Sequence, residues 1–525
     1  MTPAFTAPDI PWAALAPVLF VLGAGVLGVV VETVVPDRMR RAAHLALVLI
    51  GTGGALVAAA LLWRDVSGTG GTAVLNGSLI IDGPTVVLQA VLAALGLVSF
   101  LVIADRDAAG EDAFAPTASA VPGSEYEELA RRRGLSQGEV YPLTLFALGG
   151  MMIFPAAGDL LTLFIALEVL SLPLYLLASM ARRRRLLSQE AGMKYFLLGA
   201  FASAFLLFGI ALLYGFSGSL RLSEIAVAVT AVAGLDPLLL TGAALVLVGL
   251  LFKVGAFPFH AWTPDVYQGA PTPVTGFMAA CTKIAAFGVL LRFVYVVLPP
   301  LEWDLMPALI GVAAVTMLLG SVVAIVQTDI KRMLAYSSIA HAGFILVGVV
   351  ALNGIGIAGV LFYLLAYGLA TIGAFGVVSL VREQGADGAV LGEATHLSQW
   401  SGLGRRHPAI AVAFTAFLLS FAGIPLTAGF VGKFQVFSAA VAGGLAWLAV
   451  LGVVASAMAV FFYVRLIVLM FFTEPEGTAG ETTTVVRTDG YTAVAIAVAA
   501  LGTVALGVLP GAALDLLAQA AAFVP

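Results

Sequence analysis

Residues 250–277 read LLFKVGAFPFHAWTPDVYQGAPTPVTGF, an apolar helical pattern that carries a lysine and then breaks. Gly255 and Pro258 follow shortly after Lys253. Proline removes a backbone donor and clashes with the preceding helical turn. Inside a bilayer such a break persists only where it lines a cavity or packs within protein. A lysine beside a break in so apolar a segment therefore predicts a functional site within a membrane.

The whole chain has the composition of a membrane protein. Hydrophobic residues make up 61% of its 525 residues and charged residues 10%, whereas soluble domains carry roughly 25% charged residues. Apolar runs of about 20 residues, the length that spans a bilayer, recur from end to end. The first run, 11–35, lacks a preceding basic segment, which indicates a retained helix rather than a cleaved signal. We expect an all-α polytopic membrane protein.

The apolar runs predict about fourteen membrane-spanning helices. Their expected ranges are 11–35, 42–63, 79–104, 140–157, 159–180, 190–215, 237–268, 273–298, 305–326, 333–351, 354–381, 408–443, 446–472 and 491–514. With the N-terminus outside, the inner loops hold seventeen Arg and Lys residues and the outer loops hold two. Inner loops are richer in Arg and Lys, so we expect both termini outside and the polar loop 105–139 in the cytoplasm.

A second broken segment, LLSFAGIPLTAGFVGKF at 418–434, contains Gly423 and Pro425 and carries Lys433. The two breaks lie five spans apart on helices of opposite direction, the pattern of an inverted repeat with ion sites at its broken helices. Spans 4–8 and spans 9–13 are the expected five-helix repeats; two unrelated proline kinks are the alternative. The predicted divisions are 1–139 (three helices and the loop), 140–298 (first repeat), 305–472 (second repeat) and 473–525 (last loop and helix).

Lysine is rare and unusually placed, with five Lys against twenty Arg and only Lys331 in a loop. Arginine keeps its proton under all protein conditions, whereas a desolvated lysine can release one. We therefore predict that Lys253, Lys283 and Lys433 relay protons. Lys194 lies near a span end, where relay and simple snorkelling to the interface are equally open.

Glu168, in LLTLFIALEVLSLPLY at 160–175, is the one acid near the middle of a span. A nearby lysine would keep it ionised, and it would favour the charged form of that lysine. The alternative is a protonated glutamic acid bonded to a neighbouring helix.

Two histidines are candidates for the relay because histidine titrates near neutrality. His260 follows the first break, and His341 lies in AYSSIAHAG beside Ser337 and Ser338, whose hydroxyls could order water. A structural hydrogen-bonding role is the alternative for each. The others, His44, His396 and His407, are predicted to lie in loops or at the interface.

Several chemistries are excluded or disfavoured. The single cysteine, Cys281, excludes internal disulfides and any cysteine-ligated cluster or structural zinc within this chain alone. The GxGxxG pattern at 354–359 opens an apolar helix without the strand context of a dinucleotide site. No basic block suggests nucleic acid. We expect no bound metal or cofactor in this chain.

These motifs resemble those of the antiporter-like membrane subunits of respiratory complex I, the proton-pumping NADH–quinone oxidoreductase. The matching segments are LEVLSLPLY (167–175), MKYFLLGAFASAFLLFG (193–209), HAWTPDVYQGAPTPVTGF (260–277), DIKRMLAYSSIAHAG (329–343) and GIPLTAGFVGKF (423–434). The chain is most similar to the subunit N branch, because its broken twelfth span carries Lys433 where the M branch is expected to have Glu.

The resemblance implies a role for each matched residue. Glu168 would pair with Lys253, Lys283 would be the central relay lysine, His341 would lie between the halves, and Lys433 would face the exit side. It also implies partner subunits that hold FMN, iron–sulfur clusters and quinone, and a place in the plasma membrane. A subunit of a cation/proton antiporter or membrane-bound hydrogenase, or a non-pumping structural subunit, are the alternatives.

Overall fold

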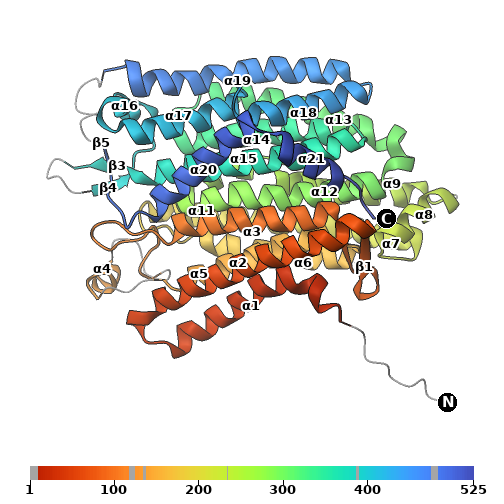
Figure 1. Ribbon diagram of the computed structural model, residues 1–525, viewed down its shortest axis with the longest axis horizontal. Helices are drawn as coiled ribbons and strands as arrows, with labels where there is room; N and C mark the ends of the chain where they lie inside the picture. Colours follow the sequence, from red (N-terminus) through yellow and green to blue (C-terminus); the bar gives the residue numbers. More distant parts are fainter. Residues whose placement is uncertain are drawn as a thin grey trace.

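The protein is a long bundle whose helices run mostly along the longest dimension of the molecule (Figure 1). The computed structural model describes residues 10–117, 124–133, 137–232, 234–385, 390–474 and 483–524. The long helices are α1 (Trp12–Val34), α2 (Asp37–Thr69), α3 (Gly83–Ile103), α5 (Val140–Ile153), α6 (Leu160–Ala178), α7 (Arg185–Ser217), α9 (Asp236–Val254), α12 (Lys283–Val296), α13 (Glu302–Ile325), α14 (Ile330–Val349), α15 (Gly354–Leu380), α17 (Pro408–Ala422), α18 (Ala428–Ala442), α19 (Ala446–Phe472) and α20 (Tyr491–Val508).

Shorter elements connect these helices. They are the helices α4 (Glu125–Arg132), α8 (Leu222–Ala231), α10 (Trp262–Gly269), α11 (Thr272–Phe277), α16 (Leu403–Arg406) and α21 (Gly511–Ala520), five single turns, η1 (Leu75–Gly77), η2 (Phe154–Ala156), η3 (Met278–Thr282), η4 (Pro299–Leu301) and η5 (Leu397–Trp400), and the strands β1 (Gly71–Val74), β2 (Leu79–Asp82), β3 (Val381–Gln384), β4 (Val390–Glu393) and β5 (Thr483–Val485).

Twelve helical segments of the described chain are long and apolar enough to cross a membrane. Four shorter apolar helices accompany them, at Val140–Ala156, Leu222–Ala231, Pro408–Ala422 and Ala428–Ala442. The helical membrane fold is thus confirmed, but the predicted count of fourteen is not, because the expected spans 140–157 and 408–443 consist of helices below full spanning length.

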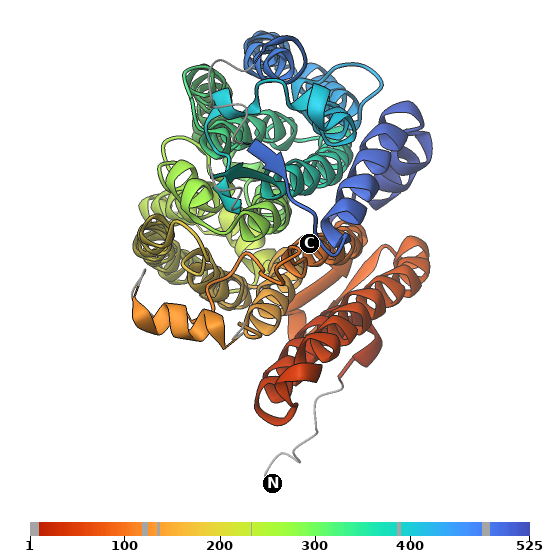
Figure 2. The same cartoon turned by 90° about the vertical axis from the view of Figure 1, so that its left-hand side faces the viewer.

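The centre of the bundle is formed by the last helix of the first predicted repeat and by the second and third helices of the second. The segment Thr272–Val296 is buried throughout its most apolar stretch, and α14 and α15 are mostly buried. By contrast α1, α2, α7 and α19 turn apolar side chains outward, as helices facing lipid or other subunits do. Figure 2, viewed along the bundle, shows these outer helices around the core.

Both predicted breaks are present, and both use the same turn. The helix α9 ends at Gly255 (φ 75°) and α17 ends at Gly423 (φ 78°). At the first break the amide of Ala256 donates to the carbonyl of Leu251 at 3.0 Å, and at the second Ile424 donates to Leu419 at 3.0 Å. A left-handed glycine closing the last turn in this way is a common helix terminator.

The two ends of the bundle differ in the loops they carry. The hairpin β1–β2 and α8 lie at one end, whereas α4, α16 and the three-stranded sheet β4-β3-β5 lie at the other (Figure 1). We call the second the arginine-rich end, because Arg182–Arg185, Arg382 and Arg405 lie there. The β-sheets and α4 were not predicted, and loop 105–139 is not wholly solvated, since Phe114 and Ala115 are buried in it.

Candidate functional site

Lys253 lies at the end of α9, one turn before the first break, and is 4% exposed. Its Nζ donates to the Ser171 hydroxyl of α6 at 2.6 Å. The rings of Tyr175 and Tyr195 lie 5.6 and 5.3 Å from Nζ and complete its surroundings. Neutral oxygen and aromatic faces therefore surround this ammonium group.

Glu168 lies one turn before Ser171 on the same helix, but it makes no ion pair with Lys253 among the described residues. Its Oε1 is buried and has no hydrogen-bond partner within the described chain. Ser171 instead donates to the carbonyl of Leu167 while it accepts from Lys253. The expected Glu168–Lys253 ion pair is thus not formed in this conformation. Lys253 donates to the Ser171 hydroxyl instead.

Lys283 begins α12 directly after a single π-helical turn, Met278–Thr282. Such turns occur often at functional sites because they redirect the side chains that follow. Its Nζ, in a side chain 4% exposed, donates to the carbonyl of Ser338 on α14 at 2.6 Å and lies 5.6 Å from the Tyr367 ring. The central lysine is again held by a neutral oxygen.

His341, on α14, is 1% exposed and lies among tyrosines of the second predicted repeat. Its Nδ1 lies 2.8 Å from the Tyr363 hydroxyl, and its Nε2 lies 3.3 Å from the Tyr463 hydroxyl. Tyr463 is also hydrogen-bonded to Ser337. The imidazole therefore joins two hydroxyl groups through its two ring nitrogens, the arrangement that a proton shuttle requires.

Lys433 lies on α18 after the second break, and its side chain folds back onto the end of α17. Its Nζ donates to the carbonyls of Phe421 at 2.9 Å and Ala422 at 3.1 Å, and to the Ser456 hydroxyl at 2.7 Å. The Phe344 ring lies 4.6 Å from Nζ. A cation at the carbonyl end of a helix also interacts favourably with the helix dipole.

A continuous line of contacts joins the central lysine to Lys433. Tyr367 lies beside Lys283, and its ring centroid is 5.0 Å from that of His341. The Phe344 ring then lies between His341, at 5.8 Å, and Lys433. In the other direction Trp262 stacks on Tyr195, beside Lys253, at 4.8 Å.

The Trp262 ring approaches Tyr267 at 6.2 Å, and the Tyr267 hydroxyl lies 3.5 Å from that of Ser338. Since the Ser338 carbonyl accepts from Lys283, Lys253, Lys283, Lys433 and His341 are brought into one row of neighbours across the bundle.

The two lower-ranked candidates lie outside this row. Lys194 has a side chain 41% exposed and pairs with Glu190 at 2.6 Å and Asp265 at 2.7 Å. It therefore carries an ordinary surface charge in this conformation. His260 is half-buried against Phe257, with ring centroids 5.6 Å apart, and its Nδ1 has no partner among the described residues.

Several residues of the row were not predicted from sequence. The hydroxyls of Tyr267, Tyr363, Tyr463, Ser171 and Ser456 contact the lysines or their neighbours, although each belongs to a helix far away in sequence. Their common signal is a hydroxyl group in an otherwise apolar helix, which is too frequent in membrane helices to single them out.

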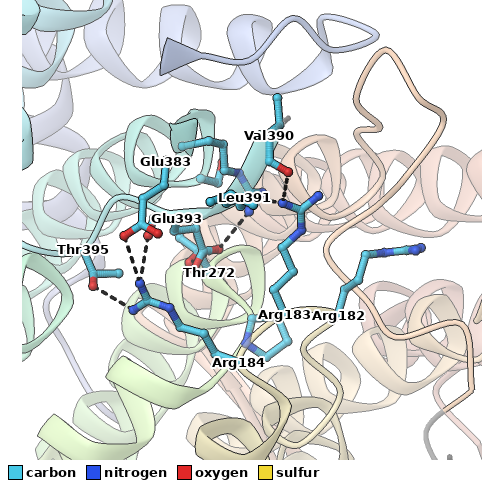
Figure 3. Close-up of polar contacts among 12 residues, drawn as sticks. Arg182, Arg183, Arg184, Thr272, Glu383, Val390, Leu391, Glu393 and Thr395 are labelled. Atoms are coloured by element: carbon cyan, nitrogen blue, oxygen red, sulfur yellow. Dashed lines mark hydrogen bonds and ion pairs between the residues drawn. The ribbon is translucent and has the colours of Figure 1, made fainter. Parts of the chain in front are cut away.

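Polar contacts at the arginine-rich end join the two predicted repeats (Figure 3). The loop between α6 and α7 supplies Arg183, which donates to the carbonyls of Val390 (2.5 Å) and Leu391. It also supplies Arg184, which donates to the Thr395 hydroxyl at 2.8 Å and pairs with Glu383 at 3.4 Å.

Beneath this contact Glu393 accepts from Thr272 at 2.7 Å and lies 3.8 Å from Lys331. The expected loop position of Lys331 was wrong, because it lies in the first turn of α14 and is 1% exposed, with Nζ donating to the Ala270 carbonyl at 2.7 Å. Burial acts to raise the pKa of Glu393, but Lys331, Arg382 and Thr272 outweigh it and hold the pKa below its usual value. We call Arg183, Arg184, Glu383, Glu393 and Thr395 the inter-repeat brace.

Of the three histidines expected in loops or at the interface, His396 and His407 lie outside the long helices, directly before η5 and α17, whereas His44 lies within a helix. His44 is 1% exposed inside α2, with Nε2 2.5 Å from Glu32, so a loop position for it was wrong. His396 lies on the surface as expected. Within the described ranges, no group of three or more His, Cys, Asp and Glu side chains is arranged to hold a metal ion.

Comparisons with known proteins agree with this architecture. Residues 157–459 match the family described as NADH:quinone oxidoreductase/Mrp antiporter, TM. The chain is 63% identical to NADH-quinone oxidoreductase subunit N of Beutenbergia cavernae, over 99% of both chains.

Solved structures match over nearly the full length as well. A chain of respiratory complex I from Thermus thermophilus, solved with bound aureothin, is 34% identical with a TM-score of 0.75, covering 96% of this chain and 100% of that one. A chain of the Mrp complex from a Dietzia species shares the fold, with a TM-score of 0.78 at 23% identity over 98% and 97% of the two chains. This chain therefore belongs to the NADH-quinone oxidoreductase subunit N family of antiporter-like membrane subunits.

Proposed function

We propose that this chain translocates protons as a membrane subunit of NADH:quinone oxidoreductase. The supporting observation is the chemistry around the three buried lysines of the row. Lys253, Lys283 and Lys433 are each 4% exposed, and within the described chain each Nζ donates to neutral oxygens without an acidic ion-pair partner. A buried ammonium group with no acidic group in ion-pair contact releases its proton more readily than a paired one.

The proposed route runs along the row of neighbours. A proton on Lys253 passes to Lys283 when the charge on Glu168 no longer favours the ammonium form, and then passes His341 through the Tyr363 and Tyr463 hydroxyls. Lys433 takes it at the exit side. Water molecules between these groups would complete the steps where side chains do not touch.

Movement of Glu168 would supply the control. In the present conformation Ser171 holds Lys253, and Glu168 Oε1 has no hydrogen bond. Bringing Glu168 against Lys253 would favour the charged lysine, and separating the two would favour proton release. Moving one charge across the membrane works against about 2.3 kcal/mol per 100 mV, which is of the order of one close charge pair at an effective dielectric constant of about 20.

The energy would come from partner subunits. FMN, iron–sulfur clusters and quinone would reside in those subunits, since the relay residues described here offer proton chemistry alone. We place the arginine-rich end in the cytoplasm, because inner loops are enriched in Arg and Lys. The start of α1 and α21 lie at the opposite end (Figure 1), so we propose that both termini are outside and that the membrane is the plasma membrane.

Replacing Lys283 tests the proposal directly. We expect Lys283→Ala and Lys283→Arg each to reduce the protons pumped per NADH oxidised several-fold in proteoliposomes of the purified complex. Arginine keeps the positive charge but not the ability to release a proton, so loss with both variants would identify proton release as the required property.

Two controls separate the rival functions. Lys194→Ala removes an exposed lysine outside the row and should leave pumping unchanged. Pumping that needs added Na⁺ or K⁺ would favour the cation/proton antiporter alternative. Normal pumping by an assembled Lys283→Ala complex would contradict the proposal and favour a structural subunit.

A further inference from the structure

A second polar site lies away from the lysine row, at the arginine-rich end of the N-terminal helices. A cavity of about 510 Å³ opens between the turn joining α1 to α2, the segment after α3 and the start of α5. Its lining includes Arg38, Arg40, Arg41, Arg106 and Arg133. No residue of the row lines it, so it serves a different purpose.

The charges around this cavity do not balance. Arg40 pairs with Asp37 at 2.8 Å, Arg41 pairs with Asp489 at 2.6 Å, and Arg106 lies 3.7 Å from Asp112. Arg38 and Arg133 have no ion-pair partner among the described residues.

The acids nearby are also shared. Asp112 additionally pairs with Arg182 at 3.3 Å, and Glu32 is hydrogen-bonded to His44 and lies 3.8 Å from Arg40. The five arginines of the lining thus face three lining acids, Glu32, Asp37 and Asp112. The cavity therefore has an excess of positive charge and open guanidinium donors.

Buried nitrogen atoms without partners lie at the same place. The Nε of Arg41 is buried and makes no hydrogen bond within the described chain, and an arginine Nε–H can only donate. His44, stacked on Tyr141 with ring centroids 5.0 Å apart, also has a buried Nδ1 without a partner. Unsatisfied buried polar atoms of this kind are uncommon and indicate an unseen ligand or water.

The outer surface beside the cavity is apolar. Val34 and Met39, on either side of the α1–α2 turn, are 72% and 57% exposed, and Val30 one turn earlier is 48% exposed. An apolar surface that continues from a basic pocket at a helix end fits an acyl chain below an anionic headgroup. A free phosphate ion would not use this surface.

We propose that the cavity binds the phosphate of an anionic phospholipid. Arg38 and Arg133 supply the open guanidinium groups, which suit phosphate oxygens because of their planar donor pairs. The acyl chains then lie along the exposed faces of α1 and α2. This site is independent of the proposed proton relay.

Lipid selectivity tests the site in the purified protein with its native partner subunits. In nanodiscs we expect labelled phosphatidylglycerol to bind several-fold tighter than labelled phosphatidylcholine, and Arg38→Gln/Arg133→Gln to remove this preference. Arg64→Gln/Arg221→Gln, which removes two charges from the opposite end, is the matched control and should keep it. Equal binding of the two lipids by the unaltered protein would overturn the proposal.

Two further measurements locate the ligand and identify its source. Phosphatidylglycerol with a photoreactive acyl chain should crosslink within residues 30–41; crosslinks found only elsewhere would refute the site. Displacement of the labelled lipid by millimolar inorganic phosphate would show a free-phosphate site instead. Both double variants replace exposed arginines with another polar residue. NADH:quinone turnover should therefore stay unchanged, which would show that the complex is still correctly assembled.

Discussion

The two broken helices end in the same turn, yet they hold their lysines in opposite ways. At the first break Lys253 precedes Gly255 and reaches sideways to Ser171 of another helix, while the indole of Trp262 donates to the carbonyl of Phe252 at 2.9 Å. At the second break Lys433 comes after the turn and donates back to the last two carbonyls of α17.

This difference indicates different roles for the two lysines. Lys433 binds two main-chain carbonyls at a helix C-terminus, where a positive charge is favoured by the backbone itself. Lys253 has one hydroxyl and two aromatic rings, so its charge depends on a group that can move. We infer that the first break responds to Glu168 and that the second is a fixed stop for the proton.

Removing the two lysines in turn should give the largest difference in stability between the two breaks. Lys433→Met leaves the Phe421 carbonyl without a donor among the described residues, which costs about 1–3 kcal/mol for a buried unsatisfied group, whereas the Ala422 carbonyl still accepts from Ser456 at 3.3 Å. Lys253→Met leaves Ser171 still bonded to Leu167 and removes a costly buried charge, so its effect on stability should be near zero. The thermal midpoint of the purified complex measures both; equal losses would contradict the assigned difference.

Alanine at the two glycines should separate stability from function. Both have a left-handed conformation, which costs a residue with a Cβ atom about 1–2 kcal/mol. A Cβ on Gly423 would also lie 2.8 Å from Lys433 Cδ, whereas one on Gly255 would lie 2.9 Å from the Thr263 hydroxyl, outside the row.

We therefore expect Gly423→Ala and Gly255→Ala to lower the thermal midpoint similarly, with pumping per NADH reduced further only by the former. A larger pumping defect in Gly255→Ala would show that the first turn, not Lys433, sets the geometry of the row.

The sequence indicated this asymmetry only in part. A lysine before one break and after the other can be read from the chain, as can the apolar setting that makes them functional. The sequence did not predict that Ser171 would hold Lys253, because the two lie on helices paired only by tertiary packing. The count of spans was also uncertain, since a broken helix such as 408–443 divides into pieces that each fall short of a bilayer.

The same limit applies at the arginine-rich end. The small sheet β4-β3-β5 joins strands from two loops that are polar and short, with no alternating apolar pattern to indicate them. The prediction of a helical membrane protein survived because hydropathy is a local property. The inter-repeat brace and the tyrosines around His341 could not be predicted from the sequence, because they depend on which helices become neighbours.

The groups that cap each break should give a smaller, matched effect. Trp262→Phe removes one hydrogen bond to Phe252 at the first break, and Ser456→Ala removes one from Lys433 at the second. Each change should cost about 0.5–1.5 kcal/mol of unfolding free energy. Only Ser456→Ala should also alter pumping. Ser456 accepts directly from the relay lysine Lys433, whereas the Trp262 indole donates to a main-chain carbonyl. Differences in thermal midpoint and pumping per NADH check this, and a pumping loss confined to Trp262→Phe would reverse the assignment.

Neutralising Glu168 should have the smallest effect on stability and the clearest effect on coupling. Because its Oε1 has no hydrogen bond within the described chain, Glu168→Gln should change the unfolding free energy by no more than about 0.5 kcal/mol. It nevertheless removes the only charge proposed to switch Lys253, so pumping per NADH should fall while the exposed control Glu190→Gln pumps normally. If Glu168→Gln pumped at full stoichiometry, the first break would be as fixed as the second, and the driving signal would have to enter the row elsewhere.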